Sequence, residues 1–164
     1  MAGAFYLLTI VAGSLALVAK SPLVNLAASV CYIAVTVLFY GIFRPVSRSL
    51  SLIAALFSLL GCAAGILPLF HLVTLPVDNL AFFGVYCLLI GYLIFRSTFL
   101  PRVLGVLMAI GGLGWLTFLS PPLARQLSPF NMAPGVLGEG ALTVWLLVKG
   151  VNVSKWEAQA GHGV

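Results

Sequence analysis

One carboxylate, Glu139, lies inside an apolar run and is the residue best placed to do chemistry. The run from Pro134 to Gly150 reads PGVLGEGALTVWLLVKG, and Lys149 is its only other charged residue. A helix rises about 1.5 Å per residue, so in a predicted helix over residues 130–150 Glu139 would lie about 14–15 Å from either end, near the middle of a bilayer. A charge at that depth costs at least about 2.5–3.5 kcal/mol. We therefore expect Glu139 to rest as the neutral acid, which both donates and accepts hydrogen bonds.

Three roles are open for Glu139. As a polar clasp, it would hold its helix to the bundle through hydrogen bonds. As a functional group, it would carry a proton or bind an ion or ligand, which is the default expectation for an ionisable residue inside a membrane. As an interface residue, it would contact a partner chain. The polar residues expected at compatible depth are Asn25, Ser29, Thr36, Ser58, Tyr86 and Thr143, the last of them one helical turn further along the same face.

A second catalytic group is not evident at that depth. The sequence contains no G-x-S-x-G, no H-E-x-x-H and no phosphate-binding loop. His71 is expected at a helix end near Asp78, and His162 in the tail. The three cysteines, Cys31, Cys62 and Cys87, fall within apolar runs without C-x-x-C spacing, which favours packing roles. We therefore predict no metal and no other cofactor, and an enzyme is the weaker interpretation.

The composition that must position these residues is that of a membrane protein. Hydrophobic residues make up 62% of the 164 and charged residues 7%, whereas a soluble domain carries about 25% charged residues. A membrane helix needs about 20 apolar residues. We predict an all-α integral membrane bundle of about six transmembrane helices in one domain, residues 1–164, with a short cytoplasmic tail, residues 151–164. The predicted helices are 4–19, 22–43, 50–73, 79–95, 103–120 and 130–150.

The basic residues predict the orientation of these helices. With the N-terminus in the cytoplasm, six basic residues fall on the inner side, namely Arg44, Arg48, Arg96, Arg102, Lys149 and Lys155, and two on the outer side, Lys20 and Arg125. The positive-inside rule favours this N-in, C-in arrangement. The net charge of +5 therefore indicates topology and contact with lipid headgroups of the bilayer, and not nucleic-acid binding.

Glycines recur on several of the predicted helices. Small residues allow membrane helices to approach closely, so we expect packing contacts at Gly61, Gly65, Gly111, Gly112, Gly135 and Gly138. Their faces would form either the interior of the bundle or an interface with another subunit or a second copy. Trp115, Trp145 and Trp156 lie towards run ends, which is typical of aromatic belts at membrane interfaces.

Three segments resemble a known family. They are GYLIFRSTFLPRVLGVLMAIGGLGW (Gly91 to Trp115), LGEGALTVWLLVKGVNVSKW (Leu137 to Trp156) and RPVSRSLSLIAALF (Arg44 to Phe57). They are similar to the bacterial membrane family catalogued as domain of unknown function 4386, over roughly the second to sixth helices. The resemblance implies a multi-helix protein of the bacterial inner membrane and supplies no catalytic residue. Family members often carry an Arg and a Glu in the third helix, whereas FSLLGCAA (Phe57 to Ala64) has neither.

The leading functional interpretation is a small non-enzymatic protein of the bacterial plasma membrane. It would act through helix contacts as an accessory or structural subunit of a membrane complex. The alternative is a small proton- or ion-linked transporter or channel that uses Glu139. A weaker alternative is a lipid- or quinone-related membrane enzyme. A water-filled path that reaches Glu139 would favour transport, and a dry bundle with a glycine-lined outer face would favour a subunit.

Overall fold

The fold is known from a computed structural model, which describes residues 2–19, 22–70 and 78–161, and these residues contain helices and no strand. The long helices are α1 (Ala2–Ala19), α2 (Pro22–Phe43), α3 (Arg48–Ile66), α4 (Asn79–Arg96), α5 (Arg102–Leu116) and α7 (Ala133–Val148). The short elements are η1 (Leu67–Phe70), η2 (Thr117–Leu119), α6 (Pro121–Leu127), η3 (Phe130–Met132) and α8 (Val153–Gly161). The predicted all-α membrane bundle is confirmed.

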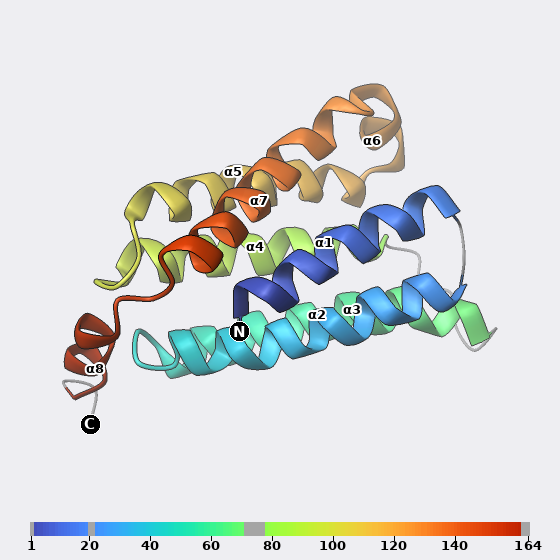
Figure 1. Cartoon of the computed structure of the whole chain (residues 1–164). Helices are drawn as coiled ribbons and strands as arrows, with labels where there is room; N and C mark the ends of the chain where they lie inside the picture. Colours follow the sequence, from blue (N-terminus) through green and yellow to red (C-terminus); the bar gives the residue numbers. More distant parts are fainter. Residues whose placement is uncertain (1, 20–21, 71–77, 162–164) are drawn as a thin grey trace.

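The six long helices run roughly along one axis (Figure 1), and their contacts close them into a ring. Each of α1 to α4 packs against the next helix in the chain, α5 packs against α7, and α7 returns to pack against α1. We call the end where α4 begins the Asp78 end, and the opposite end, where α4 finishes, the Arg96 end. The chain order around the ring explains why α1 and α7, distant in sequence, become neighbours.

Five of the predicted spans are confirmed as helices long and apolar enough to cross a membrane. They are Pro22–Phe43, Arg48–Ile66, Asn79–Arg96, Arg102–Leu119 and Phe130–Val148. The first predicted span is also helical, but its described apolar stretch, Gly3–Leu15, is shorter. The third ends earlier than predicted, because α3 gives way to the 3-10 turn η1 after Ile66. The remainder of that predicted span, with His71, lies outside the described residues, as do Lys20 and His162.

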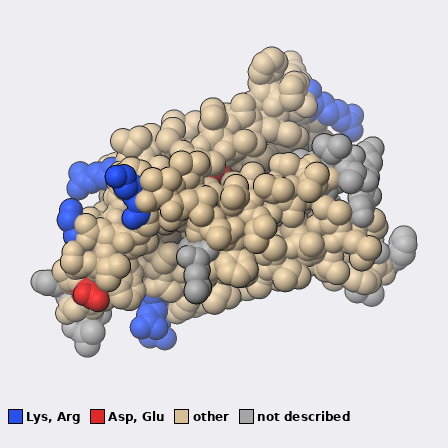
Figure 2. Space-filling model, viewed as in Figure 1, with Lys and Arg blue, Asp and Glu red and all other residues tan. Residues whose placement is uncertain are grey.

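Basic side chains gather at the Arg96 end of the ring. The visible Lys and Arg side chains lie mainly at that end, and the middle of the molecule is nearly free of them (Figure 2). Arg44 and Lys149 directly follow α2 and α7, and Arg96 is the last residue of α4. Arg48 and Arg102 are the first residues of α3 and α5. Arg125, on α6, lies at the Asp78 end. This is the charge asymmetry that the sequence predicts for a multi-pass membrane protein.

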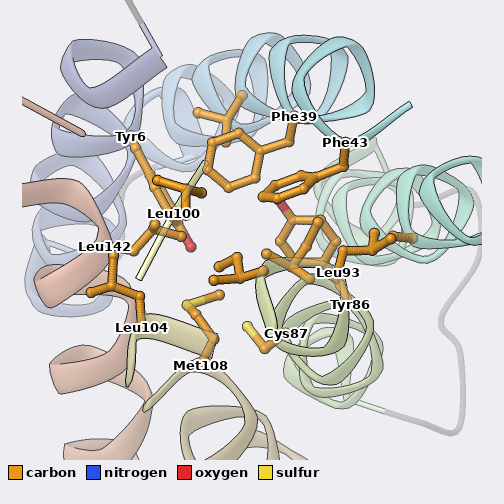
Figure 3. Close-up of a cluster of buried hydrophobic side chains, with 14 of the residues drawn as sticks. Tyr6, Phe39, Phe43, Tyr86, Cys87, Leu93, Leu100, Leu104, Met108 and Leu142 are labelled. Atoms are coloured by element: carbon orange, nitrogen blue, oxygen red, sulfur yellow. The ribbon is translucent and has the colours of Figure 1, made fainter. Parts of the chain in front are cut away.

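A packed apolar core fills the half of the ring towards the Arg96 end. Its side chains come from the six long helices and from the loop between α4 and α5, and they point towards one another (Figure 3). Phe39 and Phe43 stack edge to face with centroids 5.8 Å apart, and Met108, Leu142 and Leu93 have no exposed surface. This half of the ring is therefore closed by close-packed side chains.

Glycines let three of these helices touch through their backbones. A Cβ atom added to Gly112 would lie 2.8 Å from the carbonyl oxygen of Gly84, so α4 and α5 are in direct contact there. A Cβ on Gly138 would lie 2.6 Å from the carbonyl oxygen of Leu107, and one on Gly111 would lie 3.0 Å from that of Pro134, so α5 and α7 also touch. These glycines face the inside of the bundle.

Gly61, Gly65 and Gly135 have a different kind of neighbour. A Cβ on Gly61 would meet the ring of Phe83 at 3.0 Å, and one on Gly65 would meet the amide nitrogen of Asn79 at the same distance. A Cβ on Gly135 would collide with the indole ring of Trp115. At these three positions the absent side chain therefore leaves room for a side chain of another helix.

The helix α8 follows the last long helix and packs on the Arg96 end. Trp156 donates its indole N–H to the carbonyl oxygen of Ile42 at 2.8 Å. The Oε1 atom of Gln159 accepts hydrogen bonds from the backbone N–H and the hydroxyl of Thr98, at 3.1 and 3.0 Å. With these contacts, residues 153–161 of the predicted tail form a helix, which the sequence pattern did not predict.

Candidate intramembrane binding site

Glu139 is held by side chains from two other helices. Its Oε1 atom accepts a hydrogen bond from the indole Nε1–H of Trp115 on α5, at 2.9 Å. The same oxygen lies 3.6 Å from the Sγ atom of Cys87 on α4, which donates its S–H. We call these three residues the Glu139 cluster. It ties α7 to α4 and α5 midway along the ring.

Trp115 and Cys87 both donate to Oε1 of Glu139, and no hydrogen bond of good geometry from the described residues reaches the second carboxyl oxygen, Oε2. The hydroxyl of Tyr6 on α1 lies next to the carboxyl group without forming such a bond. Thr143, one turn along α7, donates to the backbone carbonyl of Glu139 at 2.7 Å and not to its side chain. The carboxyl group is therefore fixed at one oxygen and unbonded at the other, which leaves a position for a further hydrogen-bond or charge partner.

The other polar residues considered for Glu139 lie elsewhere. Thr36 and Ser58 form their own buried pair between α2 and α3, with hydroxyl oxygens 2.5 Å apart. The hydroxyl of Tyr86 is buried and has no hydrogen-bond partner among the described residues. Ser29 donates to the backbone of Asn25 at 3.0 Å. The structure therefore does not bring Ser58 or Tyr86 into hydrogen bonding with Glu139.

A cavity of about 470 Å³ occupies the half of the ring towards the Asp78 end, and Glu139 lies in its wall. Every long helix of the ring contributes to it. Its polar side chains are Thr9, Ser14, Asn25, Ser29, Asp78, Asn79 and Glu139, and its aromatic side chains are Tyr32, Phe83, Trp115 and Phe118. A mostly apolar cavity of this size, with a few polar groups, has the usual character of a small-molecule site.

The cavity extends from the end of the bundle to its middle. Asp78 is exposed at the start of α4, where its carboxylate caps the helix by accepting from the N–H of Leu80 at 2.9 Å. Glu139 lies about halfway along the span Phe130–Val148. Figure 2 shows a hollow between α1 and α7 with an acidic side chain at its bottom. The recess is therefore open through the side of the bundle between α1 and α7, and its lining also includes polar groups at the Asp78 end.

The cavity stops where the apolar core begins. Tyr32 belongs both to the cavity wall and to the core cluster. Beyond it, Phe39 and Val35 have 1% and 0% of their surface exposed. The cavity is thus a one-sided recess in this structure and not a channel through the bundle.

Two members of the Glu139 cluster were not found by reasoning from sequence. Trp115 was predicted to belong to an interfacial belt, and Cys87 was predicted to be a packing residue. The structure instead directs the Trp115 ring over Gly135 of α7, into the space that a Cβ would fill, and its N–H reaches Glu139. The available signal for the Trp115 contact was a tryptophan on one helix and a glycine on the helix that faces it. Among the described residues, no group of three or more His, Cys, Asp or Glu could hold a metal ion.

Comparisons with known proteins relate this site to a family. The model of the family described as domain of unknown function DUF4386 matches residues 79–150, which include Cys87, Trp115 and Glu139. The predicted resemblance is confirmed over these residues, although the motifs had extended it back to the second helix. An uncharacterised protein of Archaeoglobus fulgidus is 29% identical over 132 residues, which cover 75% of this chain and 79% of the relative. No solved structure matches the chain.

Proposed function

We propose that the protein is a membrane-embedded binding protein whose cavity takes a small amphipathic molecule, with Glu139 as the polar contact at its deep end. The observation that carries this proposal is the recess of about 470 Å³ that runs from the Asp78 end to a carboxyl group with one unbonded oxygen. An ionisable group at that depth is costly to retain without a use. The protein would be non-enzymatic, because the thiol that donates to the deep carboxyl group, that of Cys87, is fully buried and is not among the described lining residues of the cavity.

The interpretation as an accessory subunit has less support. It depended on glycine-rich faces being available to a partner, and Gly111, Gly112 and Gly138 instead face other helices of the same chain. The interpretation as a transporter shares the binding step with our proposal. It further requires the core around Phe39 and Met108 to open, because that core closes the recess towards the Arg96 end.

The proposed location is the plasma membrane of a bacterium, with both termini in the cytoplasm. The distribution of basic residues supports this orientation, and the resemblance to the family supports the type of membrane. In this orientation the cavity faces the outside of the cell. A ligand would then enter from the outer leaflet or the outer water phase.

A neutral probe tests the proposal without assuming the charge of the ligand. We would add 4-fluorobenzyl alcohol to the protein in phosphatidylcholine nanodiscs and follow its fluorine NMR signal. We expect a saturable change in the signal that empty nanodiscs do not give. The variant Gly13→Leu should abolish the change, because Gly13 lines the cavity and a side chain there meets no atom within 4 Å.

The matched control for this experiment is Gly41→Leu. A side chain at Gly41 also meets no atom within 4 Å, but Gly41 lies near the Arg96 end of α2 and does not line the large cavity. It should bind the probe like the parent. Binding that survives Gly13→Leu, or that is absent from the parent, would contradict the proposed function.

A further inference from the structure

We propose that the ligand of this cavity is an organic cation, such as a quaternary or protonated amine carried on an apolar or aromatic body. This inference rests on the proposed function, because it names the ligand class of the same cavity. Three properties of the cavity support it: the charge of its walls, its aromatic side chains and the position of the free carboxyl oxygen.

The charged side chains among the described lining residues of the cavity are all acidic. Asp78 lies at its entrance and Glu139 at its deep end, and the described lining residues include no Lys, Arg or His. The described basic residue at this end, Arg125, is not part of the lining. An anionic ligand would therefore meet the carboxylate of Asp78 and would find no cation to compensate its own charge at a depth where the dielectric is low. A cation would meet the carboxylate of Asp78 and, once Glu139 has released its proton, a second carboxylate at the deep end.

Aromatic side chains form part of the cavity wall, and one of them, Trp115, contacts the deep carboxyl group. The rings of Tyr32 and Phe83 lie 4.5 Å apart, and those of Trp115 and Phe118 lie 6.2 Å apart. They come from α2 and α4 on one side and from α5 and η2 on the other. The faces of aromatic rings attract ammonium groups, and sets of such rings are the usual binding site for quaternary ammonium ligands. The cavity thus offers aromatic faces beside its deep carboxyl group.

Glu139 is positioned as a counter-ion for such a ligand. Trp115 and Cys87 both donate to Oε1, so they fix the carboxyl group and favour its ionised form when a cation arrives. The other oxygen is left for the ligand. Binding of a cation to the neutral acid would release its proton, so the carboxyl group exchanges one positive charge for another.

This exchange predicts that the affinity for a cation rises with pH. The titratable groups that interact with Glu139 from the neighbouring helices are Tyr6, Tyr32, Tyr86 and Cys87, and none of them is basic. No described cationic side chain therefore competes with the ligand for the carboxylate. A ligand without charge would show no such pH dependence.

A charge series on one molecular body tests the proposal. The probes are 4-fluorobenzyltrimethylammonium, its uncharged carbon analogue 1-fluoro-4-(2,2-dimethylpropyl)benzene, and the anion 4-fluorobenzylsulfonate. Each is titrated by fluorine NMR into the protein in phosphatidylcholine nanodiscs, with empty nanodiscs as reference. We expect the cation to bind about tenfold more tightly than the carbon analogue, and the anion to bind least.

Titrations of the three probes into the parent protein are enough to distinguish the possible outcomes. Equal binding of the cation and its carbon analogue, or tighter binding of the anion, would overturn the organic-cation proposal and leave the proposed function standing. Absence of binding by all three probes and by 4-fluorobenzyl alcohol would overturn both. Tighter cation binding that grows as the pH rises would support both.

The variant Glu139→Gln links the preference to one residue. It keeps an oxygen that accepts from Trp115 and removes the charge. We expect the variant to bind the carbon analogue like the parent, to lose the preference for the cation and to lose the pH dependence. A variant that is folded and still prefers the cation would overturn the role of Glu139 as counter-ion. Asp78→Asn, at the entrance, should change the preference less.

Discussion

Trp115 donates its indole N–H to the Oε1 atom of Glu139 over 2.9 Å, and the two side chains come from the adjacent helices α5 and α7. This hydrogen bond has two consequences. It holds the helices together midway along the bundle, and it fixes a carboxyl group at the deep end of the cavity. The first role concerns stability and the second concerns binding, so variants at these two positions separate them.

Removing the donor should weaken the bundle slightly. Trp115→Phe loses the N–H and also the indole atoms that cover Gly135. We expect a loss of about 0.6–1.7 kcal/mol in the free energy of unfolding in detergent for the hydrogen bond, and a further loss for the packing. Glu139→Gln should unfold like the parent, because the amide oxygen still accepts from Trp115. A loss in Glu139→Gln as large as in Trp115→Phe would show that the charge, and not the hydrogen bond, stabilises the fold.

Two glycines of α7 should respond differently to substitution by alanine. Gly138→Ala should destabilise the protein by about 1–3 kcal/mol, because its Cβ would lie 2.6 Å from the carbonyl oxygen of Leu107 and would push α5 and α7 apart. Gly140→Ala, two residues along, meets no atom within 4 Å and should be neutral or slightly stabilising. Thermal unfolding in one detergent compares the two. Equal effects would contradict the close approach of these helices.

The orientation in the membrane is testable with fusions. A reporter joined after Val164 should behave as cytoplasmic, because six of the eight basic residues fall on that side in the N-in, C-in arrangement. Moving Arg44 and Arg96 to the loops of the opposite end should scramble the orientation. A reporter at the C-terminus that behaves as external in the unaltered protein would contradict the predicted topology.

The contact of α8 with the bundle predicts a local effect. Trp156→Phe removes the hydrogen bond to the carbonyl oxygen of Ile42. We expect faster hydrogen exchange over residues 153–161, with unchanged exchange in α4 and α5. Lys155→Gln, an exposed position on the same helix, serves as the control and should leave the exchange of α8 as it is. Exchange that is equally fast in the control would mean that the indole N–H does not hold α8.

The spans and the depth of Glu139 followed from sequence because hydropathy and helix rise depend on one helix at a time. The partners of Glu139 did not follow, since they depend on how each helix is rotated about its axis. Thr143 has the right spacing on α7 and yet bonds to the backbone of Glu139. The hydroxyl groups of Ser58 and Thr36 hydrogen-bond to each other, with their oxygens 2.5 Å apart. The depth of the two residues alone does not predict this pairing.

The short helices were missed for a related reason. α6 and α8 contain 7 and 9 residues, too few to give a hydrophobic period that stands out beside the long spans. The proline at the first position of α6 was a signal for its start. α8 depends on contacts of Trp156 with the end of α2 and of Gln159 with the loop after α4, both far away in sequence, so its local sequence does not specify it fully.

The glycine contacts between α4 and α5 have a mechanical consequence. A Cβ on Gly91 would meet the carbonyl oxygen of Gly105, and one on Gly105 would meet that of Gly91, at 2.7 and 2.6 Å. Gly84 and Gly112 repeat this reciprocal contact two helical turns away. Two backbones that touch at two such points cannot slide or roll independently, so α4 and α5 behave as one stiff plate. We therefore expect the cavity to widen by displacement of the walls that face this plate, α1, α2 and α3.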